Sequence, residues 1–120
     1  MIEHRLSCII RPDASGNWFI QDDVDHHAQG FYSLTQTSTH LELTFLSTYD
    51  KAGTIQISAD DDFAGSLVLG GNLGLSSSLV KLRIPGSTTV INPSQVWSAL
   101  PNLTPGSGNF WVNVTMWRNP

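Results

Sequence analysis

The sequence predicts an all-β domain, a β-sandwich of the jelly-roll or a related two-sheet type with about eight to ten short strands. Three observations predict this fold. Apolar and polar residues alternate with a period of two along much of the chain, which is typical of strands with one buried face. Turn-forming clusters of Gly, Pro, Asn, Asp and Ser separate these runs at intervals of roughly 8 to 15 residues. Only 13% of the residues are charged, whereas a helical bundle needs many charged residues on its wet faces.

Length and charge limit the number of domains and the kinds of partner that we expect for this protein. A chain of 120 residues fits a single domain, and we expect residues 1–120 to form one β-sandwich. The formal net charge is −4 and the six Lys and Arg residues are scattered, so we expect no nucleic-acid binding, which needs a clustered basic patch. No apolar run is long enough to predict a membrane span, and no signal sequence is recognisable at the N-terminus. The single cysteine, Cys8, lies in an apolar run and is interpreted as a buried, inert thiol.

The first two strands are predicted to form a hairpin. Leu6–Arg11 and Trp18–Asp22 are apolar runs, and residues 13–17 between them read Asp-Ala-Ser-Gly-Asn, which suits a tight loop. The clearest alternation follows at His40–Phe45, where Leu, Leu and Phe alternate with His, Glu and Thr. We therefore expect the three apolar side chains of this strand to face the core.

Two more strands follow the same pattern. Thr54–Ser58 is predicted to point its two isoleucines to the core. Leu79–Ile84 is predicted to bury Val80, Leu82 and Ile84 and to leave its two cations in solvent.

Turns and one helical turn are predicted between the strands. Ser94–Leu100 can form a short helical turn that Ser94 caps and Pro101 ends. The expected turns lie at residues 12–17, 28–30, 49–53, 70–74, 85–87 and 101–109.

The last predicted strand, Asn109–Trp117, is apolar on both sides. One side carries Phe110, Val112, Val114 and Met116. The other carries Trp111 and Trp117, for which three interpretations stand: burial under a loop, a subunit interface, or a platform on which sugar rings stack. Trp18 and Trp97 are expected to be core or loop anchors.

An acidic, histidine-containing loop at residues 21–27 is the candidate metal site. Carboxylate oxygens suit calcium and imidazoles suit zinc, but the spacing is not that of an EF-hand loop. The alternative is a solvated acidic loop that keeps a sheet edge from pairing with other chains. The candidate ligands are Asp22, Asp23, Asp25 and His26, with calcium as a possible ion and no other cofactor expected.

A second acidic run, Asp60-Asp61-Asp62, is favoured as an exposed turn that Phe63 anchors to the core. Calcium would become more credible if both acidic segments met at one end of the sandwich. The sequence does not place them relative to each other.

No catalytic set is recognisable, so we expect the protein not to be an enzyme. A nucleophile elbow of the form Gly-x-Ser-x-Gly between a strand and a helix is missing. The glycine-rich residues 70–74 lack the lysine and helix of a phosphate-binding loop. A sandwich hydrolase that pairs His26 or His27 with Asp23 or Asp25 is the remaining catalytic hypothesis.

Scattered short signals resemble a small β domain found in virion structural proteins of bacteriophages. The resemblance covers most of the chain without a catalytic motif, and no family binding residue can be carried over. The matching segments are Gly16-Asn17-Trp18, Asp22-Asp23, His26, Gly30, residues 33–38, residues 61–64, Gly74-Leu75-Ser76 and residues 108–112.

The resemblance implies a non-enzymatic tail-fibre or capsid accessory domain. Such a domain is made in the host cytoplasm, resides in the virion, and contacts other virion proteins. It implies a homo-oligomer, with a trimer favoured. Our own hypothesis from the residues adds attachment to a host-surface glycan, with Trp111 and Trp117 as the candidate binding residues. The alternative is a lectin-like carbohydrate-binding module, either calcium-dependent or calcium-independent, which uses Trp111 or Trp117 as its platform.

Overall fold

Alternating side chains do form strands that bury one face each, as the sequence predicts. In a computed structural model, which describes all 120 residues, eight strands and one short helical segment are formed. The elements are β1 (Ile2–Pro12), β2 (Trp18–Gln21), β3 (Phe31–Gln36), β4 (Leu41–Phe45), β5 (Lys51–Ala59), β6 (Val68–Leu73), β7 (Ser77–Arg83), the 3-10 turn Pro93–Gln95, α1 (Val96–Ala99) and β8 (Phe110–Arg118).

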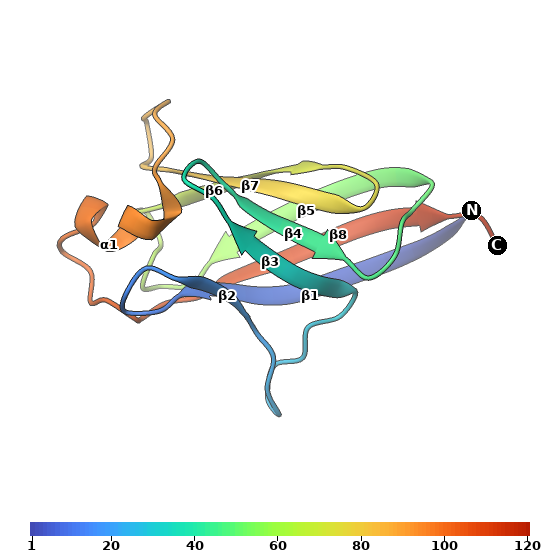
Figure 1. Cartoon of the computed structure of the whole chain (residues 1–120), viewed down its shortest axis with the longest axis horizontal. Helices are drawn as coiled ribbons and strands as arrows, with labels where there is room; N and C mark the ends of the chain where they lie inside the picture. The colour runs from blue at the N-terminus through green and yellow to red at the C-terminus, as the bar shows by residue number, and fades with distance from the viewer.

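The strands form two four-stranded antiparallel sheets that pack face to face (Figure 1). Sheet A has the order β2-β1-β8-β5, and sheet B has the order β3-β4-β7-β6. The first and last strands therefore lie side by side in sheet A. The hairpins β1–β2, β3–β4 and β6–β7 each stay within one sheet. The predicted all-β sandwich is confirmed, with eight strands.

One hydrophobic cluster fills the space between the sheets. Alternate residues of β4, β7 and β8 reach it, as the period-two pattern predicts. Phe63 is fully buried and stacks on Phe110, so the turn at Asp60-Asp61-Asp62 is anchored as predicted. Cys8 is buried in the same cluster, and burial raises the pKa of its thiol to about 12.

The helical segment closes one end of the sandwich, at the left of Figure 1. It begins after Asn92, whose side chain accepts the N–H of Ser94, so the cap lies two residues before the predicted one. Trp18 and Trp97 anchor this end, as expected: their indole N–H groups donate to the carbonyls of Pro93 and Asp13. Helix α1 is only four residues long and could not span a bilayer.

Three sequence predictions were wrong at element boundaries. Residues 70–73 belong to strand β6 rather than to a turn. Glycine suits this strand at Gly71, because a Cβ there would lie 2.6 Å from the Ile55 side chain. Strand β5 begins at Lys51, inside the predicted turn at 49–53. Ile84 lies past the end of β7 and is exposed instead of buried.

Candidate functional site

The outer side of sheet A carries the residues that the sequence singles out. Strands β1, β8 and β5 pair in register, so their outward side chains line up in rows across the sheet. We call this surface the A face. It consists of Glu3, Arg5, Ser7 and Ile9 from β1, Trp111, Asn113, Thr115 and Trp117 from β8, and Lys51, Thr54, Gln56 and Ser58 from β5.

The two predicted binding tryptophans lie at opposite ends of the A face. Trp111 is 40% exposed, and Trp117 is half-buried. They are six positions apart on one strand, which places their Cα atoms roughly 20 Å apart at about 3.3 Å per residue. The structure therefore puts both rings on one surface, as the alternation on this strand predicts.

A bulge in β5 makes room for Trp117. The register between β5 and β8 shifts between Ala52 and Thr54, which leaves Gly53 unpaired. A Cβ at Gly53 would overlap the carbonyl oxygen of Thr115 and lie 3.3 Å from Trp117 Nε1. The glycine thus lets the indole lie close over the edge strand of the sheet.

A polar hollow of about 380 Å³ lies between the tryptophans. Its outward side chains are hydroxyls, amides and one guanidinium: Arg5, Ser7, Thr54, Gln56, Asn113 and Thr115. The five uncharged side chains make no hydrogen bond within the protein, so their donors and acceptors are free for a ligand.

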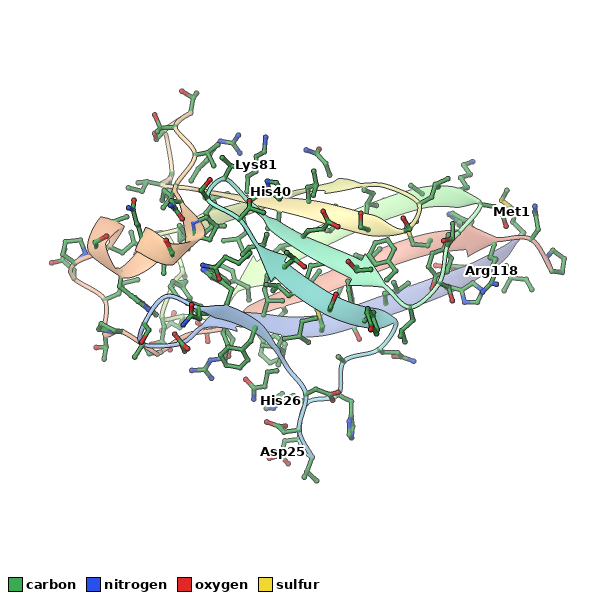
Figure 2. The ribbon with its side chains drawn as sticks, viewed as in Figure 1. Met1, Asp25, His26, His40, Lys81 and Arg118 are labelled. Carbon is green, nitrogen blue, oxygen red and sulfur yellow. The ribbon has the colours of Figure 1, made fainter.

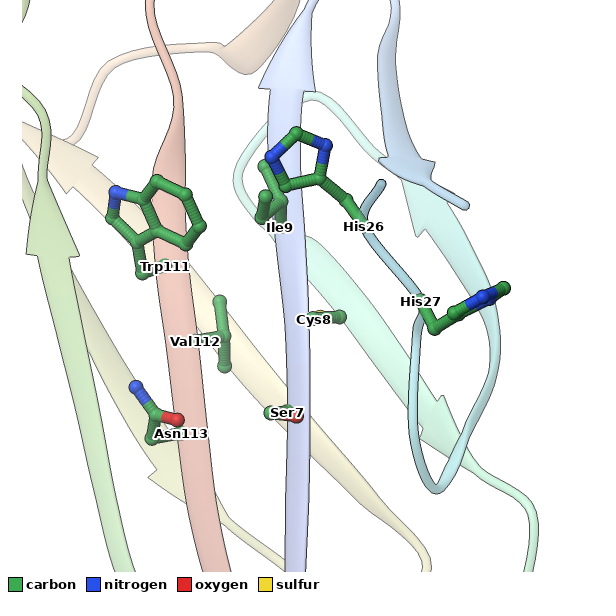
Figure 3. Close-up of a pocket in the computed structure, with 8 residues that line it drawn as sticks. All are labelled: Ser7, Cys8, Ile9, His26, His27, Trp111, Val112 and Asn113. Atoms are coloured by element: carbon green, nitrogen blue, oxygen red, sulfur yellow. The ribbon is translucent and has the colours of Figure 1, made fainter. Parts of the chain in front are cut away.

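A smaller hollow of about 140 Å³ adjoins the first at Ser7 and Asn113 (Figure 3). The loop between β2 and β3 reaches over the sheet here. His26 turns toward Ile9 and the Trp111 strand, and its ring centre is 6.0 Å from that of Trp111. Ile9 is only 5% exposed although it lies outside the core cluster, because this loop and Trp111 cover it.

Asp23 shapes this loop through hydrogen bonds. Its Oδ1 accepts the backbone N–H groups of Asp25 and His26 at 2.9 and 2.8 Å, and its Oδ2 accepts Gln21 Nε2 at 2.9 Å. His26 Nδ1 lies 3.4 Å from Asp23 Oδ1. The Gln21 hydrogen bond first, and then the His26 backbone hydrogen bond, hold the pKa of Asp23 below its usual value.

The four predicted metal ligands do not converge. Asp22 lies near His27, with 3.4 Å between Oδ1 and Nδ1, whereas Asp23 lies near His26, so the two aspartates have different histidine partners. Asp25 projects away from the sheets, farther out than His26 (Figure 2). No three His, Cys, Asp or Glu side chains anywhere in the chain are grouped so that they could hold a metal ion.

The second acidic run is used in turn formation. Asp60 Oδ1 accepts the N–H of Asp62, and its Oδ2 accepts the backbone and side-chain N–H groups of Asn109. The exposed turn that the sequence favours is what forms.

The hydrolase hypothesis requires a nucleophile, a base and an orienting acid, and the structure brings only the base and the acid into contact. Asp23 and His26 lie together, and Ser7 lines the same small hollow. No serine hydroxyl hydrogen bonds to His26 or His27, however, and a nucleophile needs that contact for activation. Figure 3 shows His27 turned away from the hollow.

Several A-face residues were missed at the sequence level. Asn113 and Thr115 could have been found, because they alternate with the tryptophans on the same side of one strand. Ser7, Thr54 and Gln56 could not, because they join the site only through the pairing of β8 with β1 and β5.

Comparisons with protein-family models, with curated proteins and with solved structures found no match to this chain.

Proposed function

We propose that the protein is a non-catalytic carbohydrate-binding module whose ligand is a linear glycan lying along the A face. One observation carries this proposal: two tryptophans bracket a hollow of unpaired hydroxyl and amide side chains on one exposed sheet.

Each part of the A face suits a part of a sugar chain. The apolar face of an indole matches the C–H face of a pyranose ring, and the indole N–H remains free to donate a hydrogen bond. Amides and hydroxyls both donate and accept, as sugar hydroxyls do. The separation of Trp111 and Trp117 leaves room for several linked rings between two stacked ones.

The rigid base of the site lowers the entropy cost of binding. Strands β1 and β8 pair over nine consecutive positions, and β5 pairs along the other side of β8. Side chains held on such strands need little reordering when a ligand arrives.

A glycan array followed by calorimetry on the best ligand tests the proposal. Trp111→Ala and Trp117→Ala should each weaken binding by about 2 kcal/mol, roughly 30-fold. Tyr32→Ala is the matched control, because Tyr32 is an exposed aromatic residue on β3 of the other sheet. The proposal fails if no glycan binds, or if Tyr32→Ala weakens binding as much as the A-face variants.

Repeating the binding measurement with a chelator distinguishes this site from a calcium-dependent one. The loop carboxylates Asp22 and Asp23 already accept hydrogen bonds from the loop itself. We therefore expect EDTA to leave the glycan affinity unchanged. A loss of binding that added calcium restores would instead support a calcium-dependent lectin.

Self-association, as a virion structural role would require, is the second candidate, and one observation favours it. The sandwich has four edge strands, and three carry features that oppose pairing with another chain. Strand β2 is only four residues long, β3 is bulged, and β5 has both a bulge and Lys51. Strand β6 pairs regularly with β7 throughout and contains no charge, proline or bulge.

A second copy of the chain could therefore add to sheet B at β6. Antiparallel pairing of β6 with its copy has two-fold symmetry, which favours a dimer over the trimer expected from the sequence. Light scattering over a concentration series measures this, and Asn72→Lys should reduce the dimer fraction whereas Thr35→Lys on β3 should not. A strict monomer at millimolar concentration would exclude the β6 interface.

A further inference from the structure

Charge is distributed unevenly between the strands and the turns. All eight aspartates lie outside the strands, at positions 13, 22, 23, 25, 50, 60, 61 and 62. The A face holds Arg5 and Lys51 against one acid, Glu3, and Arg11, the next outward residue of β1 after Ile9, lies on the same side of sheet A. Although the net charge of the whole chain is −4, the A face therefore has a small excess of positive charge.

The cations gather at the Trp117 end of the A face. Trp117 pairs with Lys51 on one side and with Glu3 on the other, and Arg5 is the next outward residue of β1. Directly paired and diagonal neighbours on one sheet face lie within reach of long side chains. A ring stacked on Trp117 would have Lys51 directly beside it on the β5 side, and Glu3 with the diagonal Arg5 on the β1 side.

Both cations keep free donors in the structure. Lys51 makes no salt bridge, and Arg5 uses only Nε, at 3.4 Å from Glu3 Oε1. The remaining nearby acid, Asp50, accepts the backbone N–H of Asn119 at 2.7 Å. The terminal guanidinium nitrogens and the ammonium group are thus available to an anion.

The Trp111 end of the A face has more acidic than basic groups. The loop beside Trp111 carries Asp22, Asp23 and Asp25, and only Asp22 and Asp23 have a histidine partner. Arg11 also points outward from β1 at this end, but its guanidinium is hydrogen bonded to Gln21 Oε1 and to the Gly106 carbonyl. An anionic group on the ligand would be repelled there and attracted at the Trp117 end.

We infer that the ligand is an acidic glycan, and that a carboxylate or sulfate group of one sugar binds between Arg5 and Lys51 while its ring stacks on Trp117. This inference rests on the proposed glycan-binding function and adds the ligand class and its direction along the strands.

Calorimetry with linear oligosaccharides of matched length tests the inference. Three oligomers serve as probes: a neutral glucan, a uronic acid oligomer and a sulfated glucan. At low salt we expect at least one acidic oligomer to bind roughly threefold to tenfold tighter than the neutral one. The acidic oligomer that binds tighter identifies the group as a carboxylate or a sulfate, and the advantage should shrink as salt is raised.

Two variants and a matched control locate the charge effect. Arg5→Met and Lys51→Met should each weaken binding of the acidic oligomer by a larger factor than they weaken binding of the neutral one, which reduces the acidic advantage. Lys81→Met is the control, because Lys81 points outward from β7 on the other sheet. An equal reduction with Lys81→Met would overturn the inference, since the effect would then come from overall charge.

The outcomes for the inference and for the proposed function are distinguishable. Neutral binding without an acidic advantage overturns the inference alone and leaves the glycan-binding proposal standing. No binding to any oligomer overturns both. Equally tight binding of a single-stranded DNA of the same charge would identify a general polyanion surface and would also overturn the inference.

Discussion

Strand β8 has two sides that share one backbone but meet different surroundings. The inner side presents four apolar side chains to the core, each at most 2% exposed: Phe110, Val112, Val114 and Met116. The outer side presents two large aromatics separated by two polar residues: Trp111, Asn113, Thr115 and Trp117. Hydrophobic burial explains every residue on the inner side. It does not explain why the outer side keeps an exposed tryptophan next to unpaired amide and hydroxyl groups.

This difference teaches where to look for function in a sandwich of this kind. A large apolar residue inside reports on packing, whereas one outside among free polar groups reports on a partner. Variants on the inner side should therefore change stability, and variants on the outer side should change binding.

The largest effect is expected from the inner side. Phe110→Ala removes a ring that stacks on Phe63 at 4.6 Å and packs near Trp18 at 5.9 Å. The free energy of unfolding should fall by about 3–5 kcal/mol, because the cavity cannot close. Urea denaturation followed by tryptophan fluorescence measures it. A loss below about 1 kcal/mol would contradict the packing described for this core.

Gly53→Val should affect both sides at once. The added side chain would overlap the Thr115 carbonyl and displace the Trp117 indole, so we expect about 1–3 kcal/mol of destabilisation and weaker glycan binding. Gly70→Val is the matched control, because nothing lies within 4 Å of a Cβ at Gly70. If both variants behave alike in melting and calorimetry, the bulge does not position Trp117.

Asn113→Val isolates the outer side. Because Asn113 is exposed and makes no hydrogen bond within the protein, stability should stay within about ±0.5 kcal/mol of the wild type. Glycan affinity should fall by about 1 kcal/mol, roughly fivefold, through the lost ligand hydrogen bonds. Thermal melts and calorimetry on the same samples check both values. Unchanged affinity would place the ligand away from the centre of the A face.

The smallest effect is expected from acidification. The pKa values of Asp13 and Asp23 are lowered, by the Asn17 backbone hydrogen bond in the first case and the Gln21 side-chain hydrogen bond in the second. Their contribution to stability is therefore complete above the unfolded value of about 3.9 and is lost as pH falls through the lower folded values. Carboxyl carbon shifts followed by NMR should show both midpoints below the usual aspartate value. A midpoint at or above that value for Asp23 would contradict the loop hydrogen bonds.

The sequence predicted which face of a strand each side chain occupies better than it predicted which strands pair with each other. The alternation at residues 109–117 placed Trp111 and Trp117 together outside the core, because side-chain direction depends only on local geometry. Strand pairing depends on contacts between distant segments, so the rows formed with Ser7 and Gln56 could not be predicted from one sequence.

One error came from giving a local signal too much weight. Gly70 and Gly71 suggested a turn, but the close approach of Ile55 makes glycine suitable within a strand at that point. The acidic loop left a cation site and a solvated loop as alternatives, and in the structure Asp23 accepts hydrogen bonds from its own loop. Such contacts depend on the folded chain and could not be predicted from the sequence.

The pairing of β1 with β8 has a consequence for how the protein forms. Each row of the A face joins residues from opposite ends of the chain, as Ser7 and Asn113 show. A nascent chain cannot complete this surface until β8 has left the ribosome, and such long-range contacts make folding slow, on the order of milliseconds to seconds. The A face is therefore completed only at the end of folding, and a truncated chain that lacks β8 would not have it.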